Sequence, residues 1–358
     1  MRSEEVTVSV RSLFSSLSIR LTPYSSLLTV FLLLSSGCSE PKTRSLQFNG
    51  PTMGSTWSVQ IPFAPDNLPP AEIEWAIVAI LDDINHKMST YIKDSELSLI
   101  NASPSTEWIE VSSELYDVLA ASDRISRETD GAFDITVGPL VNLWGFGPDK
   151  KPEQIPADEL INARKKHTGN HLIELRPSPA AIRKLDPEVY LDLSGIAPGY
   201  AADRVASRLE ELAITDYLVD ITGEVRARGV NDRHESWRVG IEKPLLDRRT
   251  VQHIVKLENT GLTTAGDYRN FFMYEGRRYS HTIDPATGRP VAHNLTLVTV
   301  IHPSATLADA LDTALMVMGP ERALAYANRN KIAALFILNR DNVLTEMYSD
   351  SFAPYLIK

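Results

Sequence analysis

Apolar side chains recur at helical spacing in several parts of the chain. The clearest example is residues 71–88, where they return every three or four positions and share one face: Ile73, Ile77, Ile80, Leu81, Ile84 and Met88. The same spacing predicts a helix over 113–127, with Ser112 in the position of an N-cap. Further helices are predicted over 157–167, from about Gly199 onward, over 305–318 and over 320–329.

Short β-branched runs bounded by Gly, Pro or Asp predict strands between these helices. They cover 55–61, 171–175, 189–193, 217–221, 224–229, 237–242, 251–257, 296–301 and 333–338. Residues 62–70 hold four prolines and are predicted to form a loop. Strands and helices alternate irregularly, and no glycine-rich dinucleotide or P-loop motif is present. The sequence therefore predicts an α+β fold of largely antiparallel sheets with packed helices, and not a Rossmann domain.

Residues 1–37 have the pattern of a signal peptide. Arg2, Arg11 and Arg20 precede an apolar run over 27–34. This run has the length of a signal-peptide core and is too short to span a bilayer. Small residues follow it, and they are followed by Cys38, the only cysteine of the chain.

Cys38 has no disulfide partner in the chain. Its thiol is therefore either free or lipidated. Ser-Gly-Cys after an apolar run resembles a bacterial lipobox, although Ser35 stands where a leucine is usual. We expect the thiol to be lipidated, to become the mature N-terminus and to anchor the protein to a membrane. The sequence thus predicts a signal peptide over 1–37, a lipidated tether over 38–47 and one domain over 48–350.

The composition excludes one large class of function. Of the 358 residues, 43% are hydrophobic and 23% charged, which is ordinary for a globular protein with a real core. The formal charge is −10, and it becomes −11 if residues 1–37 are removed. Because no block of Lys or Arg stands out, binding to nucleic acid is not expected.

Two segments carry oxygen-rich or small-residue patterns suited to phosphate and metal chemistry. In 191–203, small residues separate a predicted strand from a predicted helix; such a turn admits phosphate oxygens to helix N–H groups, and it also occurs as a plain connector. In 306–315, Asp309 and Thr313 are four residues apart and share a helix face. Their oxygens suit Mg²⁺, whereas the alternative is that Asp309 serves a helix dipole.

Four other segments supply a histidine and aromatic side chains. In 279–290, His281 precedes a turn and is either a proton carrier or a structurally satisfied histidine. Met53, Tyr91 and Phe133 occur in loop-like contexts, where a thioether and aromatic rings suit a flat heteroaromatic ligand or an ordinary core. These last three residues belong to segments 51–57, 88–91 and 131–140.

Together and in this order, the six segments resemble the ApbE family of FAD:protein FMN transferases over about residues 48–340. The resemblance implies an ApbE-like, T-fold-related architecture, FAD as the substrate and Mg²⁺ as the cofactor. Pro198 departs from the family pattern, because many relatives have Lys or Glu there. Thr222-Gly223 also departs from it, because the family often has two glycines.

The resemblance also implies roles for particular residues. The implied Mg²⁺ ligands are Gly195 and Asp312 through backbone carbonyls and Asp309 and Thr313 through side chains. His281 would assist proton transfer, and Asp284 is a second candidate. The implied flavin-binding residues are Met53, Tyr91, Ala132, Phe133, Asp134, Asp192, Pro198 and Ile283.

The implied reaction joins FMN to a Thr or Ser hydroxyl of a target protein through a phosphoester bond and releases AMP. The implied acceptors are subunits of the Na⁺-translocating NADH:quinone reductase or of the Rnf complex, on the periplasmic side of the inner membrane. Two alternatives remain open: a Mg²⁺-dependent FAD pyrophosphatase that gives FMN and AMP, and a flavin-binding lipoprotein without turnover. A structural lipoprotein is a third.

Overall fold

The structure is a computed structural model that describes residues 43–148, 155–245, 250–268, 270–341 and 343–357. The predicted signal peptide, Cys38 and the first part of the predicted tether lie outside the described residues. Within the described ranges, no helix is long and apolar enough to cross a membrane.

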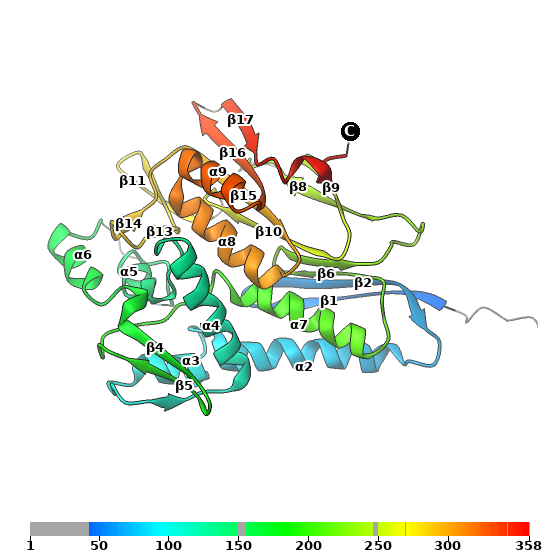
Figure 1. The fold of residues 1–358 in the computed structure, drawn as a ribbon, viewed down its shortest axis with the longest axis horizontal. Coiled ribbons are helices and arrows are strands. Elements are labelled where there is room, and N and C mark those ends of the chain that lie inside the picture. Colours follow the sequence, from blue (N-terminus) through cyan, green and yellow to red (C-terminus); the bar gives the residue numbers. More distant parts are fainter. Residues whose placement is uncertain (1–42, 149–154, 246–249, 269, 342, 358) are drawn as a thin grey trace, which may run out of the picture. The chain divides into compact units, whose positions relative to one another are not determined.

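One antiparallel sheet of eight strands forms the centre of residues 43–357 (Figure 1). Every neighbouring pair in it is antiparallel, which confirms the predicted α+β class with largely antiparallel strands. Its strands, in spatial order, are β1 (Thr43–Thr52), β2 (Ser55–Pro65), β6 (Tyr217–Ile221), β7 (Glu224–Arg228), β10 (Thr260–Gly266), β15 (Leu295–His302), β16 (Ala333–Arg340) and β17 (Val343–Tyr348).

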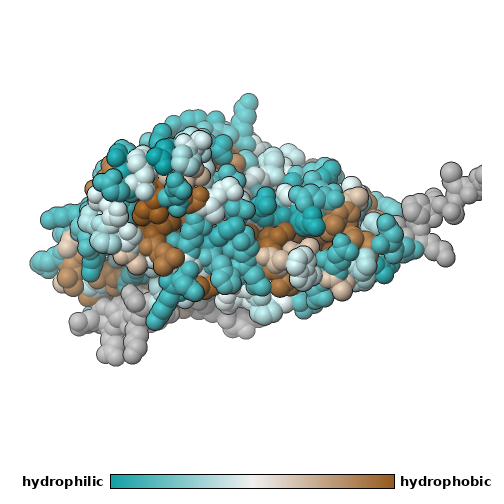
Figure 2. All heavy atoms as spheres, turned by 90° about the horizontal axis from the view of Figure 1, so that it is seen from below, coloured by the Kyte–Doolittle hydropathy of each residue, from teal (hydrophilic) through white to brown (hydrophobic). Residues whose placement is uncertain are grey.

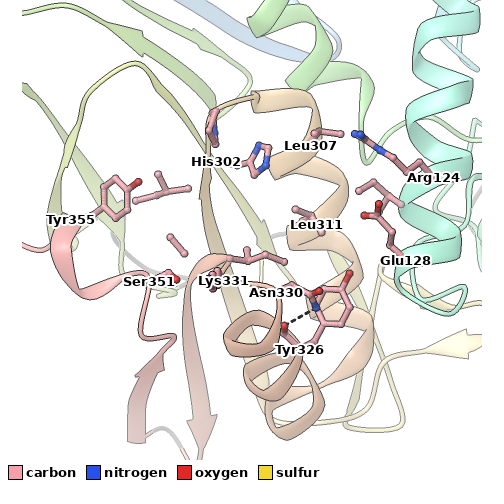
Figure 3. A pocket seen from close by; sticks show the side chains of 15 residues that line it. Arg124, Glu128, His302, Leu307, Leu311, Tyr326, Asn330, Lys331, Ser351 and Tyr355 are labelled. Atoms are coloured by element: carbon pink, nitrogen blue, oxygen red, sulfur yellow. Dashed lines mark hydrogen bonds between the residues drawn. The ribbon is translucent and has the colours of Figure 1, made fainter.

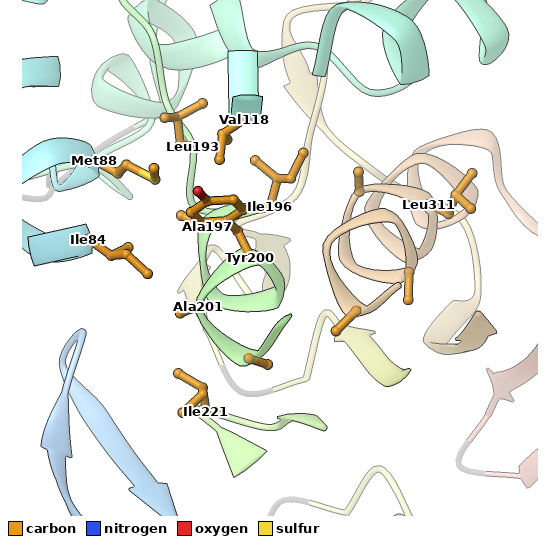
Figure 4. Packing of buried hydrophobic residues seen from close by; sticks show 14 of the residues in the cluster. Ile84, Met88, Val118, Leu193, Ile196, Ala197, Tyr200, Ala201, Ile221 and Leu311 are labelled. Atoms are coloured by element: carbon orange, nitrogen blue, oxygen red, sulfur yellow. The ribbon is translucent and has the colours of Figure 1, made fainter. Parts of the chain in front are cut away.

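Three long helices pack together over one face of this sheet: α2 (Pro70–Met88), α7 (Ala197–Glu211) and α8 (Ala305–Met318). Their apolar stripes meet in the main core, which Figure 4 shows at the crossing of α2, α7 and α8. Val118 of α4 (Ser113–Glu128) and Ile221 of β6 close the same core. The helical periodicity of the sequence therefore marks the inward faces correctly.

Smaller elements surround this layer pair. Helices α3 (Glu96–Ala102), α5 (Gly138–Leu143), α6 (Asp158–Lys165) and α9 (Pro320–Arg329) are accompanied by a three-stranded sheet and three two-stranded sheets. The three-stranded sheet comprises β3 (Ile109–Glu110), β5 (Ala180–Lys184) and β4 (Ile173–Pro177). The pairs are β8 (Trp237–Glu242) with β9 (Val251–Leu257), β11 (Phe271–Tyr274) with β12 (Arg277–Ser280), and β13 (Ile283–Asp284) with β14 (Arg289–Pro290).

Three predicted boundaries are wrong for identifiable reasons. Residues 43–47 are part of β1 and not of a tether, because they pair with the end of β2. Strand β2 continues to Pro65 through the proline-rich segment, where a register shift accommodates the chain opposite Arg44 and Leu46. Residues 189–193 form no strand, because the Leu191 backbone bonds to the side chain of Asn101.

Candidate functional site

The first turn of α7 lies directly against α8. A Cβ atom at Gly199 would lie 2.8 Å from Cβ of Asp309 and would also clash with the Ala305 carbonyl, so only glycine permits this approach. The Gly199 backbone N–H donates to Oδ2 of Asp309 over 2.9 Å. Asp309 therefore serves the N-terminus of α7, and not that of its own helix.

The N-terminus of α8 is in turn held by Asp203 of α7. The Asp203 carboxylate accepts hydrogen bonds from the Ser304 hydroxyl (2.7 Å), from the backbone N–H groups of Ala305 and Thr306 (3.0 Å each) and from the Thr306 hydroxyl (2.7 Å). Arg226 of β7 forms an ion pair with the same carboxylate at 3.4 Å. Each helix thus caps the other with a carboxylate, which fixes their relative register.

The predicted metal-binding residues come together at this contact. Gly195, in the turn before α7, faces Thr313: a Cβ atom there would be 3.0 Å from the Thr313 hydroxyl. Asp309 and Thr313 lie one turn apart on α8, and the Thr313 hydroxyl donates to Oδ1 of Asp312 over 3.4 Å. Pro198 occupies the first turn of α7 between Gly195 and Gly199.

Three carboxyl groups, those of Asp309, Asp312 and Glu224, influence one another at this contact, and burial disfavours the charged form of each. Burial raises the pKa of Asp309 and of Asp312 well above the usual range, and the carboxylate of Glu224 raises both further. Burial likewise raises the pKa of Glu224 to about 7, while the Thr222 hydroxyl donates to it over 2.6 Å. Among the described residues, no Lys, Arg or His side chain lowers the pKa of any of these three groups.

Such a buried acidic group fits a divalent cation, which would lower all three pKa values. In the part of the chain that the structure describes, no group of three or more His, Cys, Asp and Glu side chains has the arrangement of a metal site. The donor set implied by the family resemblance does not require such a group, because two of its four oxygens are backbone carbonyls and one is a hydroxyl.

A second group forms around His281, at the end of β12. Its Nδ1 lies 3.0 Å from the carbonyl oxygen of Asn270. Because a carbonyl only accepts, Nδ1 carries the hydrogen and Nε2 keeps a lone pair. The ring meets that of Phe146 edge-on at 6.3 Å between centroids. Burial lowers the pKa of His281 below its usual 6.5, opposed in part by the carboxylate of Asp192.

Tyr91 and Asp192 belong to this second group. The Tyr91 hydroxyl donates to the Phe146 carbonyl over 3.4 Å, and burial and the Asp192 charge raise its pKa. Asp192 accepts from the Ser194 backbone N–H (2.9 Å) and hydroxyl (2.6 Å), which shapes the turn that leads to Gly195. This turn connects the histidine group with the carboxylates on α8.

The loop after α4 borders the same turn. The Phe133 ring lies 3.5 Å from the position of a Cβ atom at Gly195, and the Asp192 N–H donates to the Ile135 carbonyl over 2.7 Å. Ala132 and Phe133 are buried beside it. Asp134 differs, because its carboxylate accepts from the Thr136 backbone N–H and hydroxyl and so caps its own turn.

Three other predicted residues have different surroundings. Met53 forms the tip of the β1–β2 hairpin with a positive φ of 48° and packs against the main core. Ile283 lies in a separate apolar cluster with Trp144 and Phe146. Asp284 accepts from the Ala286 N–H over 2.9 Å and stabilises the turn, so the structure gives no support to it as a base.

A cavity of about 610 Å³ lies elsewhere on α8, where Leu307 and Leu311 point toward Arg124 and Tyr326 (Figure 3). None of the predicted site residues lines it. Sequence reasoning also missed Glu224 as part of the acidic group. Its only signal was the departure at Thr222-Gly223, because its acidic neighbours on α8 lie far along the chain.

Comparison with known proteins gives the family of the chain. Residues 53–336 match the model of the ApbE family. The FAD:protein FMN transferase of Vibrio cholerae is 43% identical over 327 residues, covering 91% of this chain and 97% of the relative. That of Escherichia coli K12 is 44% identical over 310 residues, covering 86% and 88%.

Solved structures give the same result. The flavin transferase ApbE from Vibrio cholerae superposes with a TM-score of 0.81 at 41% identity, covering 88% of this chain and all of that chain. The ApbE protein of Thermotoga maritima superposes with a TM-score of 0.79 at 29% identity. With nearly all of the described residues matched in sequence and in fold, the chain belongs to the ApbE family.

Proposed function

We propose that this protein moves the FMN part of FAD onto a Thr or Ser hydroxyl of another protein and releases AMP, with Mg²⁺ as cofactor. The observation that carries the proposal is that residues 192–199 link the two groups. Gly195 lies against Thr313 and Gly199 bonds to Asp309, while the Asp192 carboxylate acts on the pKa of His281. The activity named for relatives at 43% and 44% identity supports it.

The metal would be held by the carbonyls of Gly195 and Asp312 and the side chains of Asp309 and Thr313. Oδ2 of Asp309 already accepts the Gly199 N–H, so Oδ1 remains for the cation. When bound, Mg²⁺ neutralises charge that develops on the pyrophosphate oxygens. The α7 N-terminus adds a favourable field for phosphate at the same place.

In the transfer step, the acceptor oxygen forms a bond to the FMN-side phosphorus. The bond from this phosphorus to the AMP oxygen breaks, and its electron pair leaves with AMP. Nε2 of His281 takes the proton of the acceptor hydroxyl, because Nδ1 is occupied by the Asn270 carbonyl. The lowered pKa of His281 keeps the ring neutral, and the nearby Asp192 carboxylate stabilises it once it is protonated.

We further propose that the protein is exported, lipidated at Cys38 and held on the periplasmic side of the inner membrane. Support comes from the apolar run over 27–34 and from the lone cysteine that follows it. The acceptors would be subunits of the Na⁺-translocating NADH:quinone reductase or of the Rnf complex, which would present their hydroxyl in the same compartment.

Intact-mass spectrometry of an acceptor domain tests the proposed reaction. The protein from Ser39 onward is mixed with FAD, Mg²⁺ and the acceptor, and a parallel sample contains EDTA. The expected result is an acceptor heavier by one FMN only when Mg²⁺ is free. An acceptor with no mass gain while AMP accumulates would favour the pyrophosphatase.

A further inference from the structure

The flavin site lies at one end of β1, β2 and α2, and the described chain begins at their other end. Thr43 pairs with Pro65 at the base of the β1–β2 hairpin, whereas Met53 forms its tip. Helix α2 starts beside the base, where the Arg44 guanidinium bonds to the Leu68 carbonyl. It ends beside the tip, where the Asn85 amide donates to the Thr52 hydroxyl over 3.2 Å. Figure 1 shows this common direction.

The separation follows from the lengths of these elements. The ten residues of β1 span about 30 Å at 3.3 Å per residue, and the nineteen residues of α2 span about 28 Å at 1.5 Å per residue. Tyr91 of the site follows directly after α2, three residues beyond Met88. The base of the hairpin is therefore about 30 Å from the end of the molecule that binds flavin.

An unusual exposed surface lies toward the base end. Trp75, in the second turn of α2, is 72% exposed, and Val78 on the next turn is also exposed. Trp75 lines a shallow pocket of about 230 Å³ with Arg204 and Arg208 of α7. We call these four residues the Trp75 surface. Figure 2 shows hydrophobic side chains among polar ones on the face that α2 forms.

The chemistry of this surface suits a layer of lipid headgroups. Tryptophan prefers the membrane–water interface, and arginines beside it can contact phosphate groups. Arg208 also pairs with Glu211 at 2.8 Å. Glu72 in the first turn of α2 and Glu74 just after it are exposed as well. The surface is therefore mixed in charge. Its affinity for the membrane would come mainly from Trp75.

We propose that the Trp75 surface rests on the membrane, with the flavin site at the far end of α2 from the anchored start of β1. The inference depends on the proposed lipid anchor at Cys38. Only four residues separate Cys38 from Thr43, so five steps of at most about 3.6 Å keep β1 within about 18 Å of the anchor. The acceptor hydroxyl is then met about 30 Å from the anchored end of the molecule.

Quenching by brominated lipids tests the surface in the full, lipidated protein. Vesicles of phosphatidylethanolamine and phosphatidylglycerol carry phospholipid brominated near the headgroup. Trp57, Trp144 and Trp237 are buried and shielded. With five tryptophans in the chain, we expect the loss of about one fifth of the emission. Trp75→Phe should abolish the loss, and the control Trp108→Phe should preserve it.

The two proposals fail in different ways. If the protein does not float with the vesicles, the anchor is contradicted and the surface with it. If the protein floats but Trp75→Phe quenches like the native protein, the surface alone is overturned.

Discussion

Asp309 has two roles in our proposal. Its Oδ2 accepts the Gly199 N–H, and its Oδ1 would bind the cation. Asp312 is equally buried, but in our proposal only its carbonyl serves the metal. The two neighbouring residues therefore make a matched pair for testing which carboxylate carries the function.

We predict that Asp309→Asn lowers the transfer rate by about a hundredfold or more at saturating FAD, because the amide keeps the bond to Gly199 but loses the charge. The fold should survive, since removing a buried charge relieves desolvation. Rates and melting temperatures are measured beside those of Asp312→Asn, which should lose less activity. Equal losses in the two variants would refute the assigned roles.

The histidine gives a prediction about pH. The pKa of His281 is lowered from 6.5 by burial, so its ring becomes protonated only below that value. Transfer should persist to below pH 6.5 and then fall, with the charge of Asp192 limiting how far the midpoint moves. His281→Asn should be slower and should lose this acid limb. An acid limb that is unchanged in the variant would remove His281 from proton transfer.

At the scale of elements, the reciprocal capping of α7 and α8 sets the geometry of the site. Asp203 accepts four hydrogen bonds from the start of α8, while Asp309 of α8 accepts one from the start of α7. A shift of either helix would change the distance between Gly195 and Thr313. The site is thus built on two mutually fixed helices.

We predict that Asp203→Ala lowers the free energy of unfolding by about 0.5–2 kcal/mol, the usual range for loss of a cap. It should also raise the Mg²⁺ concentration for half-maximal transfer, because the ligands on α8 lose their fixed position. Asp123→Ala is the control, since Asp123 bonds to Arg127 and Asn170 away from α8. An unchanged Mg²⁺ requirement would show that Asp203 has only a structural role.

The sequence predicts best those elements whose structure is determined by neighbouring residues in the chain. Helices α8 and α9 begin and end at the predicted residues, and Ser112 caps α4 by accepting from the Leu115 N–H. Strand β10 was missed because it contains Gly261, which is needed where α8 packs: a Cβ atom there would lie 2.7 Å from Cα of Ala305. Such close contacts depend on tertiary packing and cannot be predicted from a local sequence pattern.

The site follows the same division. The pair Asp309 and Thr313 is visible from helical spacing, and family resemblance supplied their meeting with Gly195. Glu224 was missed because it begins strand β7, and only the folded sheet brings it near Asp309 on α8. Asn101 was missed because its side-chain amide bonds to the backbone of Leu191, ninety residues later in the chain. Contacts of this kind depend on the complete fold.

At the scale of the whole molecule, β1 and α2 carry the proposed flavin site at one end and the start of β1 at the other. In our proposal, the enzyme is held at the membrane by one end and modifies its partner at the other. In the proposed reaction the nucleophile comes from outside the chain, so an acceptor hydroxyl and water would compete for the same phosphorus.

The most direct test of the central claim is the ratio of AMP released to FMN bound on the acceptor, measured in one sample by chromatography and intact mass. A transferase predicts one AMP for each FMN attached, with little AMP when the acceptor is withheld or its Thr or Ser is replaced by Ala. AMP formed at the same rate without any acceptor hydroxyl would contradict transfer and identify the protein as a pyrophosphatase.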